Sequence, residues 1–302
     1  MIAVKKNQRA PEHTLTDKEF RFICQLVYDS TGIVLDDRKR EMVYRRLMRR
    51  TRELRIPSFK DYCLLLKNED NQELPNFINA ITTNLTGFFR ESHHFDFLKD
   101  QFIPAHLAKY AATKRLRVWS AACSTGEEPY SLAITLKQAM DSFLNQGKLN
   151  QGKVSQWDVK ILATDLDSTV LETAKVGTYS QDNIKDLSKE IKHKWFKKGS
   201  GDNSDKVKVN PQLKGLITFK QLNLMGSWPV QGPFDVIMCR NVLIYFDRNT
   251  QHELVDRFYQ LLRPGGLLML GHSESLMKEE SAFEVKGRTI FQKPIHRCQQ
   301  TY

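Results

Sequence analysis

The 302-residue sequence has no apolar run approaching the roughly 18 residues that a membrane-spanning helix needs. Its first residues, MIAVKKNQRAPEH, contain no apolar stretch suited to a signal peptide. The five cysteines are odd in number and include no C-x-x-C pair, which argues against a disulfide framework and against a zinc cluster. Glycine and proline are too few for a collagenous or low-complexity chain. We therefore expect a globular cytoplasmic protein with reduced thiols, no metal and no direct membrane insertion.

Basic residues are in excess, with 46 Lys and Arg against 35 Asp and Glu, a formal net charge of +11. This charge favours an acidic partner, which can be a nucleic acid, an anionic membrane or an acidic protein surface. The length suits one large domain or two smaller ones.

The first part of the chain, residues 14–85, has the pattern of a helical domain. Thr16 and Glu19 have the spacing of a capping box, and Gly32 is placed to end the helix that they begin. A second helix is expected over 37–54, followed by two short ones over 59–67 and 74–81.

The 37–54 helix is strongly basic on one side. At 100° per residue its apolar residues share one face, and the opposite face gathers Arg38, Arg45, Arg49 and Arg52. A solvated face is one interpretation of such a pattern. Because arginines at helical spacing repel one another, we favour the other interpretation, a docking surface.

From residue 116 onward, short β-rich runs alternate with helical ones. Strands are expected over 116–121, 159–164, 216–220, 234–239, 267–271 and 289–292, and helices over 128–144, 169–175 and 249–262. This alternation predicts an α/β domain over 116–295 with a mostly parallel, doubly wound sheet, joined to the helical domain by a linker over 86–115. Residues 179–215 are too long and too polar for a simple connection. Ligands of such sheets bind beyond the carboxyl ends of the strands.

The residues at these strand ends indicate the ligand. After the first strand, WSAACSTGEEP lacks the G-x-G-x-x-G of a dinucleotide site and has two acids that would repel a phosphate but suit a cationic ligand. Asp165 ends the second strand, where an acid can accept the hydroxyls of a ribose. Together these features favour S-adenosylmethionine over NAD or ATP, and spacing alone leaves the choice between Glu127 and Glu128 open.

Longer motifs narrow the interpretation. The run LLRPGGL at 261–267 resembles the Rossmann-like methyltransferases. Three further segments are similar to the CheR family of chemotaxis receptor methyltransferases: TNLTGFFRE at 83–91, WSAACSTGEEPYS at 119–131 and FDVIMCRNVLIYFD at 234–247. The resemblance covers residues 14–294 and implies an all-α N-terminal domain before a class I methyltransferase domain with a small β-subdomain.

The resemblance also implies an activity: S-adenosylmethionine-dependent methylation of glutamate side chains on chemoreceptors, leaving S-adenosylhomocysteine. Residues Arg90 and Tyr245 would lie near the transferred methyl group. The cofactor contacts carried over by motif are Asn84, Thr86, Arg90, Glu128, Asp165, Asn223, Leu224, Arg240 and Asn241.

The resemblance also implies which partners the protein binds. The basic face of Arg38, Arg45, Arg49 and Arg52 would dock on the acidic cytoplasmic helical bundle of a receptor. The segment 179–215 matches the β-subdomain, and Gly199 and Gly201 resemble a Gly-x-Gly turn that grips a receptor's C-terminal tail peptide.

Two other functions are alternatives. A nucleic-acid methyltransferase would carry N-P-P-Y or a Pro-Cys nucleophile near the fourth strand, where this chain has Arg240-Asn241-Val242-Leu243, so we expect no nucleic-acid partner. A cofactor-binding signalling scaffold without turnover is the second alternative, and the presence of Arg90 and Tyr245 argues against it.

Overall fold

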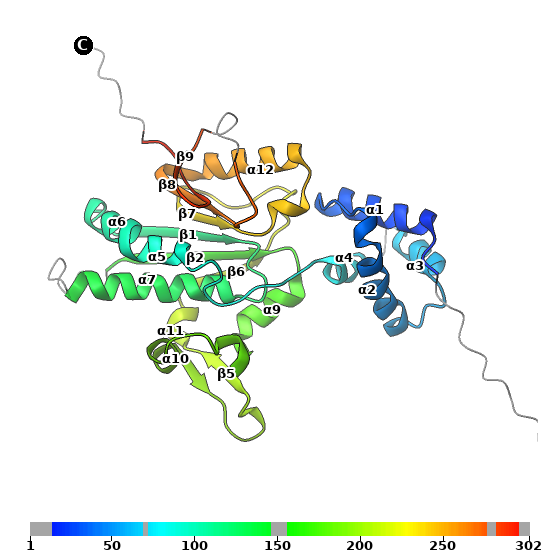
Figure 1. Ribbon diagram of the computed structural model, residues 1–302, viewed down its shortest axis with the longest axis horizontal. Coiled ribbons are helices and arrows are strands. Elements are labelled where there is room, and N and C mark those ends of the chain that lie inside the picture. Colours follow the sequence, from blue (N-terminus) through cyan, green and yellow to red (C-terminus); the bar gives the residue numbers. More distant parts are fainter. Residues whose placement is uncertain (1–13, 69–71, 146–155, 277–281, 296–302) are drawn as a thin grey trace, which may run out of the picture. The chain divides into compact units, whose positions relative to one another are not determined.

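The computed structural model describes residues 14–68, 72–145, 156–276 and 282–295 (Figure 1). The chain divides into two compact units, residues 1–83 and 84–302. Within the described part, no helix is both long and apolar enough to cross a membrane.

The first unit is all helical and its starts and stops follow local sequence. It contains α1 (Asp17–Thr31), α2 (Arg40–Glu53), α3 (Phe59–Leu66) and α4 (Leu74–Ile81). Thr16 and Glu19 form the expected capping box on α1, and Gly32 ends that helix in the left-handed conformation that glycine favours. The expected 37–54 helix begins instead as a 3-10 turn, η1 (Asp37–Lys39), so Arg38 lies before α2.

In η1 and α2, two arginines turn inward and four are exposed. Arg46 and Arg50 turn inward: Arg46 donates to the carbonyl oxygen of Thr82 at 2.7 Å, and Arg50 Nη2 donates to buried Glu73 at 2.7 Å. Four others are exposed, namely Arg38, Arg45, Arg49 and Arg52. Three of these four pair with acids of the same segment, through Arg38–Asp36, Arg45–Glu41 and Arg49–Glu53.

The second unit is built on a seven-stranded sheet. Its order is β6 (Ile217–Gln221), β2 (Asp158–Asp165), β1 (Arg115–Ala121), β7 (Phe234–Cys239), β8 (Leu262–Leu270), β10 (Ile290–Gln292) and β9 (Glu284–Gly287). The first five strands are parallel to one another, β10 is antiparallel to β8, and β9 is antiparallel to β10. The central strands are apolar on both faces, which is the pattern of a parallel sheet covered by helices on both sides.

Helices cover both faces of this sheet (Figure 1). On one face, Leu116 and Val118 pack with α7 (Glu127–Asn145) and α6 (Ile103–Lys109). On the other face, Trp119 contacts Phe258 of α12 (Arg248–Leu261), with ring centroids 5.4 Å apart. A further helix, α9 (Ser168–Val176), follows β2.

Residues 86–115 are not a linker. They form α5 (His93–Phe97), the π-helical turn η2 (Leu98–Phe102) and α6, and they belong to the second unit. Phe95, Leu98, Ile103 and Leu107 are buried in its main core. Burial of this apolar surface holds the segment against α7, so the domain boundary lies before Asn84 rather than at 116.

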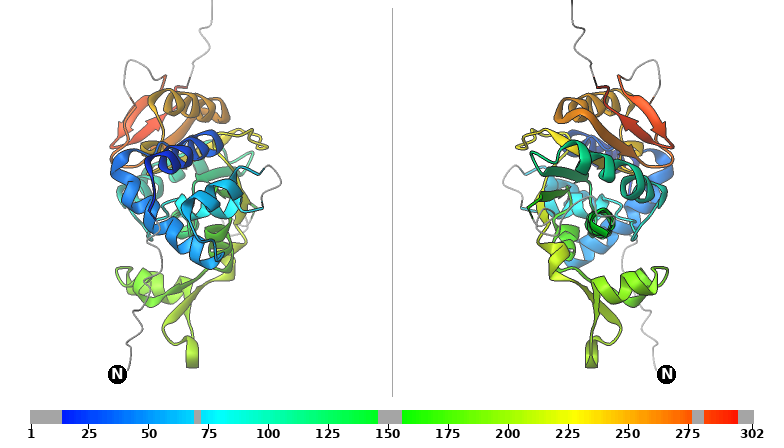
Figure 2. Two further views of the ribbon diagram at one scale, coloured as in Figure 1. Left: turned by 90° about the vertical axis from the view of Figure 1, so that its right-hand side faces the viewer. Right: turned by 90° about the vertical axis from the view of Figure 1, so that its left-hand side faces the viewer.

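A small second sheet interrupts the α/β alternation. It has the order β3 (Thr178–Ser180), β5 (Lys206–Val209), β4 (Phe196–Lys198), all antiparallel. The turns η3 (Gln181–Ile184) and η4 (Gly201–Asn203) and the short helices α10 (Lys189–Trp195) and α11 (Pro211–Lys214) complete it. The hairpin of β4 and β5 projects from the rest of the unit (Figure 2). The predicted fold class, an all-α domain before an α/β domain with a β-subdomain, is confirmed.

Candidate active site

The carboxyl ends of four neighbouring strands meet at one edge of the main sheet. Ala121 of β1 is in register with Thr164 of β2 and with Cys239 of β7, while Asp165 pairs with Gln221 of β6. The residues that follow these strand ends are therefore brought together. Because β1 is flanked by β2 on one side and by β7 on the other, this edge is also where the strand order reverses.

Asp165 is buried at the end of β2 and organises the loops beside it. Its carboxylate accepts the main-chain N–H of Ser124 at 2.7 Å and that of Asp167 at 2.9 Å. Burial raises the pKa of Asp165 to about 6. Asp167 begins α9 as its N-cap and accepts the side-chain amide of Asn84 at 2.8 Å. Asn84 is thereby held next to Asp165, as Ser124 Oγ also donates to the Asn84 carbonyl oxygen at 2.9 Å.

The structure distinguishes Glu127 from Glu128. Glu127 accepts a hydrogen bond from Thr125 at 2.6 Å. Glu128 accepts one from Ser120 at 2.7 Å, and its other oxygen lies 3.6 Å from Nη1 of Arg240. The pKa of Glu128 is raised, because the effect of burial exceeds that of the charges of Arg240 and Arg90, which lower it. Glu128 is therefore the acid on the side of Arg90 and Arg240.

Arg240 is a buried cation between two carboxylates. Its Nε lies 3.7 Å from Glu91 and its Nη1 3.6 Å from Glu128, distances too long for hydrogen bonds. Its Nη2 donates to the carbonyl oxygen of Arg90. Among the described residues, Arg240 Nε, Arg240 Nη1 and Glu91 Oε2 are buried without a hydrogen-bond partner. Such unsatisfied groups are costly and indicate a place where a polar ligand binds.

Glu91 joins the segment before α5 to the loops after β7 and β8. It accepts hydrogen bonds from the imidazole of His272 at 2.9 Å and from Asn241 at 3.4 Å. Burial raises the pKa of Glu91, but these hydrogen bonds and Arg240 together hold it below its usual value. Buried His94 lies 3.7 Å from Glu91, and burial lowers its pKa to about 3, so this imidazole is neutral at pH 7.

Arg90 is half-buried at the same place. Its Nη1 donates to the carbonyl oxygen of Leu85 at 2.8 Å. The described residues offer its other guanidinium N–H groups no hydrogen-bond partner. Arg90 can therefore still bind an incoming anion.

The loop after β7 is held by one carboxylate. Glu274 accepts the main-chain N–H groups of Asn241 at 2.9 Å, Val242 at 2.8 Å and Ile244 at 3.4 Å, and also that of Gly271. Asn241 has a φ of 59°, a left-handed conformation that needs such support in a non-glycine residue. Tyr245 ends the following turn, η5 (Leu243–Tyr245), and is half-buried.

The loop after β6 is braced from α12. Asn223 accepts the main-chain N–H of Met225 at 3.0 Å. Arg257 donates to the Leu224 carbonyl oxygen at 2.8 Å and lies over the ring of Trp228, 3.7 Å from its centroid. The Leu222 N–H donates to the Asp165 carbonyl oxygen at 2.9 Å, so Asn223 and Leu224 lie next to the end of β2.

The structure gathers most of the predicted site residues into two groups. Asn84 and Asp165 are joined through Asp167 and Ser124. Arg90, Glu128, Arg240 and Asn241 are joined through contacts with Arg240 and Glu91. Thr86 lies between Asn84 and Arg90, half-buried. Gly199 and Gly201 lie in the β4–β5 hairpin, and Arg38, Arg45, Arg49 and Arg52 belong to the first unit.

Sequence reasoning missed Glu91, Asp167, His272 and Glu274. Glu91 follows Arg90 inside a recognised motif, and Asp167 precedes a helix, a usual place for an N-cap. For Glu274 the only signal in the sequence is its position, three residues after the glycine Gly271 that follows a buried strand.

The fold and the site together define a class of protein. Rossmann-like methyltransferases that use S-adenosylmethionine have a sheet with this strand order and an acid at the end of its second strand. They also have acidic residues at the start of the helix that follows the first strand, here α7, in place of a glycine-rich phosphate loop.

Comparison with known proteins identifies the family. Residues 18–82 match the family model "CheR methyltransferase, all-alpha domain", and residues 84–291 match "CheR methyltransferase, SAM binding domain". The chain is 44% identical to a chemotaxis protein methyltransferase of Salmonella typhimurium, over 92% of this chain and 90% of that one. The corresponding protein of Escherichia coli is 43% identical over 92% and 91%, and chemotaxis protein methyltransferase 2 of Pseudomonas aeruginosa is 41% identical over 93% and 94%. The chain belongs to the CheR methyltransferase family.

The chain is therefore an S-adenosylmethionine-dependent methyltransferase, as its motifs predicted. The nucleic-acid methyltransferase and the scaffold without turnover receive no support from these relatives. Among the described residues, no group of three or more His, Cys, Asp or Glu side chains could hold a metal ion.

Proposed function

We propose that this enzyme transfers the methyl group of S-adenosylmethionine to glutamate side chains of chemoreceptors, forming glutamyl methyl esters. The observation that carries this proposal is the buried cluster of Arg240, Glu91 and Glu128 beside Arg90, in a chain whose relatives are chemotaxis protein methyltransferases. The residues that would take part follow the ends of β1, β2, β6 and β7 or lie in the segment before α5.

The residues present fit the cofactor. The unsatisfied buried N–H groups of Arg240 suit the carboxylate of its amino-acid part, and the excess of carboxylates over cations suits its ammonium and sulfonium groups. Asp165 and Glu128 would hold the ribose and the amino-acid part, and Asn223 and Leu224 the base. Asn84, Thr86 and Asn241 would close the site around them. When bound, the cofactor supplies an electrophilic methyl group on a positively charged sulfur.

The chain's own task is to position and dehydrate the acceptor. A glutamate carboxylate is already ionised at pH 7, so its attack needs no general base. An anion and a cation neutralise one another as the O–C bond forms and the C–S bond breaks, and water would stabilise the separated charges. A dry site that holds the acceptor in line therefore lowers the barrier.

Arg90 and Tyr245 are the residues proposed for this positioning. The free N–H groups of Arg90 can orient the acceptor carboxylate or the carboxylate of the cofactor. Tyr245 lies on the loop that Glu274 holds, and its hydroxyl or its ring face can guide the methyl group. Near-native turnover in both Arg90→Ala and Tyr245→Phe, with cofactor still bound, would contradict these roles.

The direct test is methyl transfer from labelled S-adenosylmethionine to receptor-containing membranes, with RNA as a control. We expect label on receptor protein that is released by base, the signature of a methyl ester. Label in RNA, or cofactor binding without any labelled receptor, would overturn the proposal.

The exposed arginines of η1 and α2 would dock the acidic helical bundle of the receptor in the cytoplasm. Three of the four form exposed ion pairs, which contribute little to stability. They can therefore exchange these partners for receptor carboxylates at little cost, and added salt should weaken the docking.

We predict that Arg49→Glu raises the KM for receptor about tenfold, equivalent to about 1.4 kcal/mol, with cofactor affinity unchanged. The reason is that a reversed charge repels the acidic bundle. Lys60→Glu makes the same change at an exposed position of α3 and is the matched control. Equal KM values for the two variants at low salt would contradict the prediction.

The β4–β5 hairpin would bind the receptor's C-terminal tail and raise the local concentration of substrate. Its two glycines are required for different reasons. A Cβ at Gly199 would meet the Asn203 carbonyl oxygen at 2.1 Å, whereas Gly201 has open space around it but a φ of +59°.

We therefore predict that Gly199→Ala rebuilds the turn and abolishes binding of a receptor-tail peptide, measured by calorimetry. Gly201→Ala should weaken binding only slightly, since a single left-handed residue costs about 1 to 2 kcal/mol. Activity on a receptor without its tail should be equal in both variants and the wild type. Undiminished peptide affinity in Gly199→Ala would exclude this hairpin as the tail site.

A further inference from the structure

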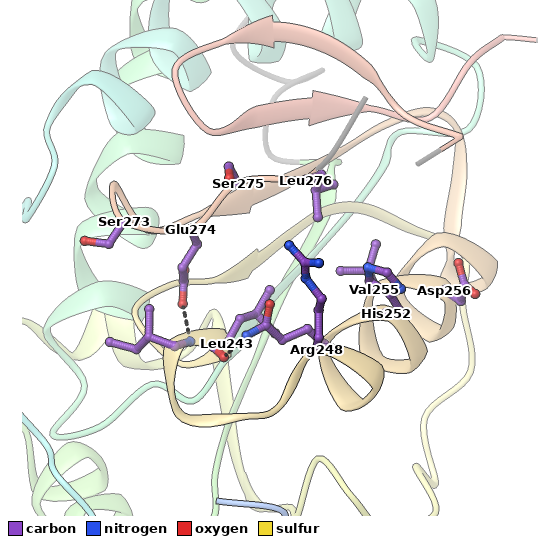
Figure 3. Close-up of a pocket in the computed structure, with 11 residues that line it drawn as sticks. Leu243, Arg248, His252, Val255, Asp256, Ser273, Glu274, Ser275 and Leu276 are labelled. Atoms are coloured by element: carbon purple, nitrogen blue, oxygen red, sulfur yellow. Dashed lines mark hydrogen bonds between the residues drawn. The ribbon is translucent and has the colours of Figure 1, made fainter. Parts of the chain in front are cut away.

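A cavity of about 270 Å³ lies next to the loop that carries Tyr245, and none of the roles above uses it (Figure 3). Its walls come from η5, from the first turns of α12 and from the segment that follows β8. Leu243, Val255 and Leu276 give it apolar surface, and Arg248, Asp256 and Glu274 give it charge.

Arg248 is the cation of this cavity. Figure 3 shows its guanidinium extending from the start of α12 toward Leu276, between the two walls. The described residues form no hydrogen bond and no ion pair with its side chain. A guanidinium that lines a cavity and that the described residues leave without a carboxylate partner is able to bind an anion.

The acids of the same cavity do not neutralise Arg248. Glu274 directs its carboxylate at four main-chain N–H groups, including those of Val242 and Ile244. Asp256 is eight residues after Arg248 on the same helix, about 12 Å along its axis at 1.5 Å per residue. In Figure 3 Asp256 lies beyond Val255 and His252 from Arg248.

The combination of apolar walls and an unpaired guanidinium matches an aliphatic side chain that ends in a carboxylate. The position of the cavity matches a protein substrate. Arg248 follows Tyr245 by three residues, and Leu243 and Ile244 of the same turn line the cavity. A polypeptide that presents one glutamate beside Tyr245 would carry a neighbouring side chain over this cavity.

We propose that the cavity is a carboxylate subsite in which Arg248 binds an acidic side chain of the substrate protein close to the glutamate that is methylated. The subsite rests on the proposed function, because it needs a protein substrate at Tyr245. Binding at this subsite would favour methylation of glutamates that have an acidic neighbour. The selection would come from a contact that does not involve the reacting groups.

The test compares Arg248→Gln, Arg248→Lys and Lys160→Gln, with the cytoplasmic fragment of a chemoreceptor as substrate. Lys160 is an exposed lysine on β2, so its variant removes one positive charge away from the cavity. We expect Arg248→Gln to raise the KM for the fragment about tenfold. Arg248→Lys should recover part of that loss, and Lys160→Gln should match the wild type. The affinity for S-adenosylhomocysteine should be the same in all four proteins.

A second measurement identifies the partner of Arg248. Each acid near the methylated glutamate is changed to glutamine in turn, and the KM is measured with both the wild type and Arg248→Gln. One change should raise the KM of the wild type and leave that of Arg248→Gln unaltered, which is the coupling expected of a direct pair.

The two proposals fail in different ways. A wild-type enzyme that esterifies no receptor overturns the proposed function, and the subsite with it. A wild-type enzyme that is active, together with an Arg248→Gln variant whose KM equals that of Lys160→Gln, overturns the subsite alone. Absence of any coupled acid in the receptor also overturns it.

Discussion

Arg240→Gln is expected to abolish methyl transfer and to lower the free energy of unfolding by about 3 to 5 kcal/mol, the usual cost of removing one member of a buried charge cluster. Without the guanidinium, Glu91 and Glu128 repel each other in a buried site, since the charge of Glu91 already raises the pKa of Glu128. The Arg90 carbonyl oxygen also loses its donor. Thermal unfolding and calorimetric titration with S-adenosylhomocysteine measure the two effects.

Two further variants separate charge balance from cofactor binding. Arg240→Gln combined with Glu91→Gln should regain much of the stability, because one unpaired charge is removed, but it should not regain cofactor binding. Arg117→Gln removes another partly buried arginine, one that pairs with Asp158 at the start of β2. It should lose stability while keeping cofactor affinity. If Arg240→Gln has the melting temperature and the cofactor affinity of the wild type, the cluster is not part of the site.

Glu274→Ala is expected to have the second largest effect. It deprives four main-chain N–H groups of their acceptor, and each buried unsatisfied group costs about 1 to 3 kcal/mol. Asn241 then loses the support of its left-handed conformation, and η5 with Tyr245 moves. We expect kcat to fall by at least about tenfold, equivalent to 1.4 kcal/mol, together with a lower melting temperature.

Glu274→Gln is the matched variant. Its amide keeps one accepting oxygen, but its NH2 group faces main-chain donors, so stability and kcat should lie between those of the wild type and Glu274→Ala. Comparison of kcat with cofactor affinity distinguishes a loop effect from a general loss of folding. A Glu274→Ala variant with wild-type kcat would show that this loop does not position a reacting group.

Elements defined by neighbouring residues could be predicted from the sequence. The capping box of Thr16 and Glu19, the stop at Gly32 and the strand over 234–239 are all present where they were expected. The strand expected at 267–271 begins earlier, at Leu262, directly after α12. Leu262 pairs with Phe234 of β7, and pairing resumes at Leu267 after a register shift that leaves Pro264 and Gly265 without a partner in β7. Such a shift is a tertiary feature that the local pattern does not reveal.

Dependence on contacts between distant parts of the chain also explains why residues 86–115 were wrongly predicted to be a linker. The segment follows the helical domain and precedes the first strand, so its pattern suggested a connection. Its helices are stabilised by burial of Phe95, Leu98 and Leu107 against α7, which is a contact between distant parts of the chain.

The sequence by itself determined the helix caps, the alternation of strands and helices, the acids that exclude a dinucleotide and the motifs of the family. Each of these depends on residues that are close in the chain. Only the tertiary structure decided that Arg240 lies between Glu91 and Glu128, that Glu128 rather than Glu127 faces this cluster, and that Glu274 holds the loop of Tyr245. Arg90 and Arg240 are 150 positions apart. They meet because the segment before α5 lies beside the end of β7, a contact between distant parts of the chain that no local pattern specifies.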